Sequence, residues 1–113
     1  MPGQLKGTIT GKNTSLNGLF KDSDAGQDCE LIGKFDESPP KDIGEVDALL
    51  KDYGTIPEGR CEFSGTIGPT QFSLNFYRLE DGSVAATVTG NLSDEIEPYD
   101  VNGTATWQVK LED

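Results

Sequence analysis

Two stretches of this chain repeat one another. GTITGKNTSLN at residues 7–17 is followed, 58 residues further along, by GTIGPTQFSLN at residues 65–75. Each stretch begins with Gly-Thr-Ile, passes through a turn-forming segment and ends with Ser-Leu-Asn, which is typical of two short strands joined by a turn. The repeated stretches therefore predict a β protein, and their collinear match indicates an internal duplication.

The same offset of 58 aligns a second region of each half. It pairs acidic and proline residues, namely Asp36 with Asp94, Glu37 with Glu95, Pro40 with Pro98 and Asp42 with Asp100. Residues 7–42 thus contain ten identities at this offset, where average composition gives about two or three by chance. We expect two half-repeats, residues 4–53 and 60–111, within one domain that spans residues 1–113. The alternative is that strands and turns simply favour these residues.

Alternation of apolar and polar residues with a period of two dominates the chain and predicts about seven strands. The expected strands are residues 4–10, 14–20, 28–35, 60–67, 71–78, 83–90 and 103–111. Within 83–90, the alternation places Val84, Ala86 and Val88 on the inner face. Two half-repeats of such strands would close as a β-sandwich or a small barrel.

Residues 42–53 depart from the alternation. Their apolar residues fall at helical spacing, at Ile43, Val46, Leu49, Leu50 and Tyr53. Asp42 suits a helix N-cap, and Gly54 suits the residue after a helix C-terminus. We therefore expect a mainly β, single-domain antiparallel sandwich or small barrel with one helix, about residues 42–53, which covers an edge or plugs an open end.

The charge of the chain restricts its partners. Nine Lys and Arg residues against twenty Asp and Glu, with no His, give a net charge of −11. Such a charge repels the phosphate backbone of nucleic acids and anionic lipid surfaces. We expect no nucleic acid and no membrane among the partners, and a protein with a basic surface or a cation instead. The alternative is that the charge only keeps the chain soluble.

Location is predicted from what the sequence lacks. No apolar run approaches the roughly 18 residues of a membrane span, and the first residues do not follow a signal-peptide pattern. We therefore expect a cytoplasmic protein. Three Asn-x-Ser/Thr sequons, at Asn13, Asn91 and Asn102, support the alternative of a secreted chain whose signal peptide has been removed.

Cys29 and Cys61 are the only cysteines. Both alternate in phase with apolar neighbours, which predicts two buried thiols. We expect free thiols in a cytoplasmic chain, and a single disulfide is the alternative.

Catalysis is not expected. Without His, the chain contains neither a Ser/His or Cys/His catalytic pair nor a His-based metal centre. No glycine-rich loop precedes a helix in the manner of a phosphate-binding site. We therefore expect no enzyme and no cofactor other than a metal ion.

A possible calcium motif lies in KDSDAGQDCE, residues 21–30. Asp22, Asp24 and Asp28 are spaced around Gly26 so that three carboxylates could converge on one ion, and calcium prefers several such hard oxygen ligands. The twelfth position of the motif is Gly33 rather than Glu, so it is not an EF-hand. The alternative is a solvated hairpin turn.

The two acidic segments that the repeat shares form the other candidate site. Its residues are Asp36, Glu37, Asp94, Glu95, Glu97 and Tyr99. They could form a negative surface for a basic protein or a twinned cation site. The structural alternative is that Asp42 is a helix cap and that each proline forms a turn.

These features favour a non-catalytic binding protein that engages a basic partner, as inhibitors and immunity proteins do. A calcium-dependent or carbohydrate-binding β module is the alternative. A barrel that holds a small apolar ligand is a third hypothesis, limited by the large side chains that would fill the interior. We expect a monomer or a homodimer.

Overall fold

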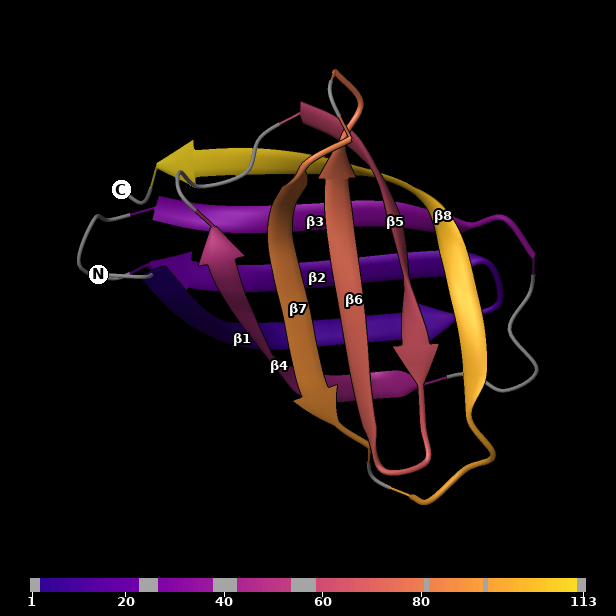
Figure 1. The fold of residues 1–113 in the computed structure, drawn as a ribbon. Coiled ribbons are helices and arrows are strands. Elements are labelled where there is room, and N and C mark those ends of the chain that lie inside the picture. The colour runs from indigo at the N-terminus through magenta and orange to yellow at the C-terminus, as the bar shows by residue number, and fades with distance from the viewer. Residues whose placement is uncertain are drawn as a thin grey trace.

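The chain forms a closed barrel of eight antiparallel strands. The structure is a computed structural model that describes residues 3–22, 27–37, 43–53, 59–80, 82–92 and 94–111. The strands are β1 (Gly3–Lys12), β2 (Ser15–Asp22), β3 (Gln27–Phe35), β4 (Gly44–Tyr53), β5 (Gly59–Ile67), β6 (Gln71–Arg78), β7 (Val84–Asn91) and β8 (Tyr99–Leu111). The mainly β, antiparallel barrel expected from the sequence is therefore confirmed (Figure 1).

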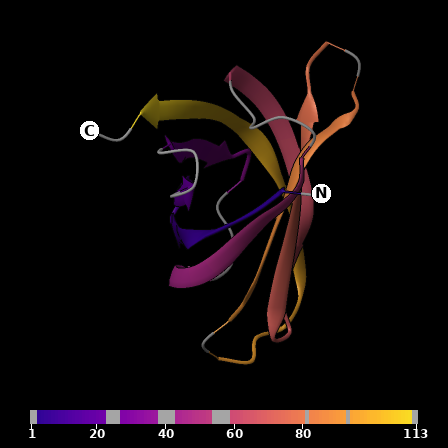
Figure 2. The same cartoon turned by 90° about the vertical axis from the view of Figure 1, so that its left-hand side faces the viewer.

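The order of strands around the barrel follows one scheme twice. The closed order β1-β2-β3-β8-β5-β6-β7-β4 contains β3-β2-β1-β4 and then β7-β6-β5-β8. Strands β1 to β3 lie on one side and β5 to β7 on the other, and β8 curves from one side to the other (Figures 1 and 2). Each half of the chain thus contributes a three-stranded meander and one strand that joins it to the other half.

The expected helix at 42–53 is wrong. This segment is β4, which pairs with β1 along its length and with β7 over part of it. The buried side chains of its described part are Val46, Ala48 and Leu50, while Glu45 and Asp47 are exposed, so the period is two. Without β4, β1 and β7 would each present an unpaired edge, and closing the barrel outweighs the local helical spacing.

Aromatic side chains fill the interior. The ring of Trp107 lies 5.1 Å from that of Phe76 and 6.0 Å from that of Phe20, measured between ring centroids. Phe63 contacts both Phe76 and Phe35, at 5.5 and 5.6 Å. All five side chains are at most 2% exposed, so they form one continuous core.

One inward prediction fails in β7. Val84 is 46% exposed, whereas Ala85 and Ala86 are both buried. The register between β6 and β7 shifts at Phe76 and Tyr77, and such a bulge inserts one extra residue into a strand. The shift moves Val84 from the inner to the outer face.

The two cysteines are buried and form no disulfide, as expected. Both flank Trp107 across β8: Cys29 of β3 is opposite Val109, and Cys61 of β5 is opposite Ala105. Burial raises the pKa of the Cys61 thiol from its usual 9.0 to about 11, and an interaction with the Trp107 indole N–H partly offsets the rise. That interaction is looser than a full hydrogen bond, because Trp107 Nε1 has no partner of good geometry.

Candidate functional site

Antiparallel order assigns every connection to one of the two rims of the barrel. The chain leaves β1, β3, β5 and β7 at one rim, and leaves β2, β4 and β6 at the other, where β1 also begins and β8 ends. Both acidic segments of the sequence therefore belong to the same rim. We call this the acidic rim and define it by Asp36, Glu37, Asp94, Glu95 and Glu97, all of which are exposed.

Asp36 and Glu37 directly follow β3. The backbone N–H of Asp36 donates a hydrogen bond of 2.9 Å to the carbonyl oxygen of Asn102 in β8. This bond extends the pairing of the two strands by one residue beyond Phe35 and Gly103. The Asp36 backbone is thus fixed to the barrel while its side chain is exposed. Residues 38–42, which include Pro40 and Asp42, lie outside the described residues.

The segment between β7 and β8 is held against the barrel by apolar side chains. Leu92, Ile96 and Tyr99 are partly buried and pack on the core. The N–H of Ile96 donates to the carbonyl oxygen of Pro69 at 2.8 Å. Asp94, Glu95 and Glu97 remain exposed between these anchors. Tyr99, which the sequence predicts as part of the binding surface, thus packs on the core beside the exposed carboxylates.

The first residues of β8 link the two acidic segments. Tyr99 pairs with Ile67 at the start of β8, and Asn102 accepts the hydrogen bond from Asp36 three residues later. Between them, Asp100 is exposed and its Oδ1 accepts a 3.0 Å hydrogen bond from Thr66 Oγ1. Asp100 adds a further carboxylate to the surface that joins the two segments.

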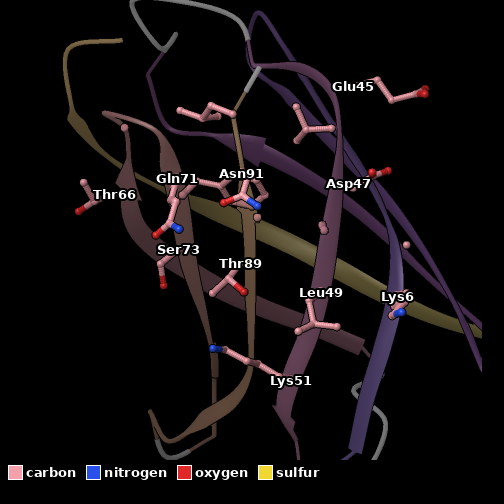
Figure 3. A pocket seen from close by; sticks show the side chains of 17 residues that line it. Lys6, Glu45, Asp47, Leu49, Lys51, Thr66, Gln71, Ser73, Thr89 and Asn91 are labelled. Carbon is pink, nitrogen blue, oxygen red and sulfur yellow. The ribbon is translucent and has the colours of Figure 1, made fainter. Parts of the chain in front are cut away.

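A groove opens on the outer face between β4 and β7. It has a volume of about 1170 Å³. Figure 3 shows Glu45 and Asp47 along one wall, and Gln71 and Asn91 on the other. The predicted helix did not place Glu45 and Asp47 beside this groove, because their position there depends on β4 being a strand. Their alternation with the buried Val46 and Ala48 is the signal that identifies them.

Two of the proposed calcium residues lie at the opposite rim, where Asp22 ends β2 and Asp28 lies near the start of β3. Asp24 and the side chain of Asp22 are outside the described part of the chain. Asp28 lies in β3 opposite Lys21 and Lys110. Lys110 Nζ instead forms a salt bridge of 3.1 Å with Glu30 Oε2, and Asp28 Oδ1 is buried with no hydrogen-bond partner. Among the described residues, no group of three His, Cys, Asp or Glu is placed to hold a metal, so the calcium site stays a prediction.

Comparisons with known proteins do not assign this barrel to a class. No protein-family model matches the sequence, and no curated protein matches it significantly. In the parts of the chain that the structure describes, no helix is long and apolar enough to cross a membrane.

Proposed function

We propose that this chain is a non-catalytic binding protein that engages the basic surface of another protein through its acidic rim, in the manner of an inhibitor or an immunity protein. The observation that supports the proposal most directly is the strand order. It brings two acidic segments that are 58 residues apart in the sequence to the same rim of the barrel. Concentrated charge of one sign favours association with a surface of the opposite sign.

The way in which the acidic rim is supported also favours binding. Asp36 is fixed by its backbone hydrogen bond to Asn102, and the segment from Asp94 to Glu97 is anchored through Ile96. Groups that are already held in place lose less conformational entropy when a partner binds. The carboxylates are exposed, so their attraction to a partner is screened by salt. Affinity should therefore fall markedly as ionic strength rises.

The proposal is tested with tetralysine as a minimal basic probe, in an NMR titration of the isotopically labelled chain at low salt. We expect the largest amide shift changes at Asp36, Glu37 and the segment from Asp94 to Glu97, and we expect them to be lost at about 0.5 M salt. A double variant, Glu95→Gln with Glu97→Gln, should weaken binding several-fold.

The matched control removes the same charge elsewhere on the barrel. Glu62→Gln with Glu80→Gln also takes the net charge from −11 to −9, since two carboxylates are lost, but both residues lie outside the acidic rim and are exposed. The control should bind nearly as well as the unaltered chain. Equal weakening by both double variants would mean that only net charge matters, and the proposal of a specific rim would fail.

A further inference from the structure

Of the neighbouring strands in the barrel, β4 and β7 pair over the fewest residues. The register pairs four residues of β4, Ala48 to Lys51, with Thr87 to Gly90 of β7. On its other edge, β4 pairs with β1 from Tyr53 to Gly44. Among the described strands, residues Gly44 to Asp47 therefore have a partner on one edge only. This segment is the open edge of an otherwise closed barrel.

The backbone of this open edge faces the groove. The carbonyl oxygen of Asp47 lies 2.5 Å from the point that a Cβ on Gly90 would occupy, so it points toward β7. Alternate residues of an antiparallel strand direct their N–H and C=O to the same edge, so the backbone groups of Glu45 point that way as well. The chain after β7 turns away instead, because Leu92 N–H donates to the Thr70 carbonyl oxygen at 2.7 Å.

The side chains around the open edge define what could lie there. Glu45 and Asp47 are exposed beside it, and Gln71 and Asn91 provide amide groups across the groove (Figure 3). The groove is also lined by Lys6 and Lys51, but these lie beside the part of β4 that pairs with β7, since Lys6 is opposite Leu49 and Lys51 is opposite Thr87. Between the two carboxylates, Val46 lines the groove together with Leu92. An added strand would therefore meet acidic groups at alternate positions and an apolar surface at the position between them.

We propose that the groove binds an extended basic segment of the partner protein, which adds as a strand to β4 at Gly44 to Asp47. This inference rests on the proposed function and specifies the form of the partner: lysine or arginine at alternate positions, with an apolar residue between them. Strand addition of this kind draws affinity from backbone hydrogen bonds and specificity from alternate side chains. A second copy of this chain is disfavoured, because it would place acidic edges of like charge side by side.

The probe is the peptide acetyl-Thr-Lys-Val-Lys-Val-Lys-Thr-amide, titrated into the labelled chain. We expect amide shift changes at Glu45, Val46, Asp47 and Asn91. A second peptide has the same sequence but is N-methylated at alternate backbone amides, so it keeps the charge and loses the hydrogen bonds of one edge. It should bind at least about tenfold more weakly, since each lost donor leaves an acceptor without its partner.

Two variants at one position separate charge from backbone. Glu45→Gln removes the carboxylate and should lower the affinity for the unmethylated peptide about threefold, as expected for an exposed charge pair. Glu45→Pro removes the same carboxylate and also the backbone N–H that faces the groove. It should lower the affinity for the peptide by about a further tenfold. Proline is tolerated at strand positions whose N–H is unpaired, and circular dichroism of each variant checks the fold. If Glu45→Pro fails to fold, the comparison of the two peptides on the unaltered chain still tests whether backbone hydrogen bonds contribute to binding.

The outcomes distinguish this inference from the proposed function. Equal binding of the two peptides, with shift changes at Asp94 to Glu97 and none at Glu45, would overturn strand addition and leave the acidic rim as the binding surface. Absence of binding by tetralysine and by both peptides would overturn both proposals. Dimerisation that perturbs Glu45 and Asp47 without any peptide would show that the open edge is an interface between two copies, and the inference would be wrong.

Discussion

Gly7 in β1 and Gly65 in β5 occupy equivalent places in the two halves of the barrel. Each is opposite a buried residue of the following strand, Phe20 for Gly7 and Leu74 for Gly65. A Cβ on Gly7 would collide with the carbonyl oxygen of Leu19, and a Cβ on Gly65 would collide with the corresponding oxygen of Ser73. The repeated Gly-Thr-Ile therefore has a physical reason: both meanders need a close approach of two backbones at this point.

Substitution of either glycine by alanine should destabilise the barrel strongly. The atom that obstructs the new Cβ is backbone, so the strands must separate rather than a side chain rotate. We expect Gly7→Ala and Gly65→Ala each to lower the free energy of unfolding by about 3 kcal/mol or more, measured by urea denaturation.

Gly33→Ala is the matched control for these variants. A Cβ there would lie 3.3 Å from the Cβ of Ala105, so we expect a loss of less than about 1 kcal/mol. Similar losses at Gly33 and Gly65 would show that the close approach of β5 and β6 is unimportant.

The repeat predicts the strand order better than it predicts the register. Offset 58 aligns Leu16 with Leu74, but Leu16 is opposite Gly11, whereas Leu74 is opposite Gly65. The second strands of the two hairpins are therefore shifted relative to their partners, because the two turns lie at different places in the repeat. The first turn lies between Lys12 and Ser15, whereas the second lies between Gly68 and Gln71, where the Gly68 N–H donates to the Gln71 carbonyl oxygen. Sequence identity alone does not contain turn geometry, and duplication of the chain stays a hypothesis.

The sequence contained a signal for β4 that helical spacing obscured. At offset 58, residues 45–53 align with residues 103–111, which the alternation correctly predicted as a strand. Leu49 is apolar at an outward position and is half-buried, and with Leu50 it mimics a helical stripe. Acidic residues are also uncommon in strands. What local residues could not predict is that β4 is required to close the barrel between β1 and β7.

Trp107 reports on the interior directly, since it is the only tryptophan. Because it is 2% exposed, we expect blue-shifted emission that acrylamide quenches poorly, with a shift to the red on unfolding. Phe76→Leu removes the edge-to-face partner of the indole and should lower stability by about 1 to 3 kcal/mol. Tyr77 is the neighbouring residue and is half-buried, so Tyr77→Leu should lower the free energy of unfolding by less than Phe76→Leu does. Efficient quenching of the native chain would contradict a filled interior.

The buried thiol of Cys61 predicts a dependence of stability on alkaline pH. Its pKa is raised to about 11 in the folded chain, from 9.0. Above pH 9.0 the unfolded chain loses this proton while the folded chain keeps it, so unfolding becomes easier as pH rises toward 11. The protonated thiol therefore makes its full contribution to the stability of the fold below pH 9.0.

The comparison of the unaltered chain with Cys61→Ala isolates this contribution from the Lys and Tyr residues that both proteins share. Between about pH 8 and about pH 10.5, the free energy of unfolding measured in urea should fall by up to about 2 kcal/mol more for the unaltered chain than for the variant. Parallel pH profiles would show that the thiol is not desolvated. Reaction with a thiol reagent should likewise require unfolding, and rapid labelling of the native chain would lead to the same conclusion.

The calcium hypothesis for Asp22, Asp24 and Asp28 makes a separate prediction, at the rim opposite the acidic one. Asp28 Oδ1 is buried without a hydrogen-bond partner in the described structure, and a bound cation would satisfy it. Calcium that binds only the folded chain must raise its stability, by about 2.7 kcal/mol at a hundred times the dissociation constant. A thermal melt with millimolar calcium should therefore show a higher melting temperature than one with a chelator.

Asp28→Asn should abolish this rise, because the amide keeps the shape of the side chain and loses the charge that calcium requires. Asp100→Asn at the acidic rim is the control and should retain it. A rise that survives Asp28→Asn but disappears with Asp100→Asn would place the ion on the acidic rim and support the twinned cation site instead. If neither the unaltered chain nor the control responds to calcium, these carboxylates do not form an ion site. The negative charge of the acidic rim is then available to a basic protein partner.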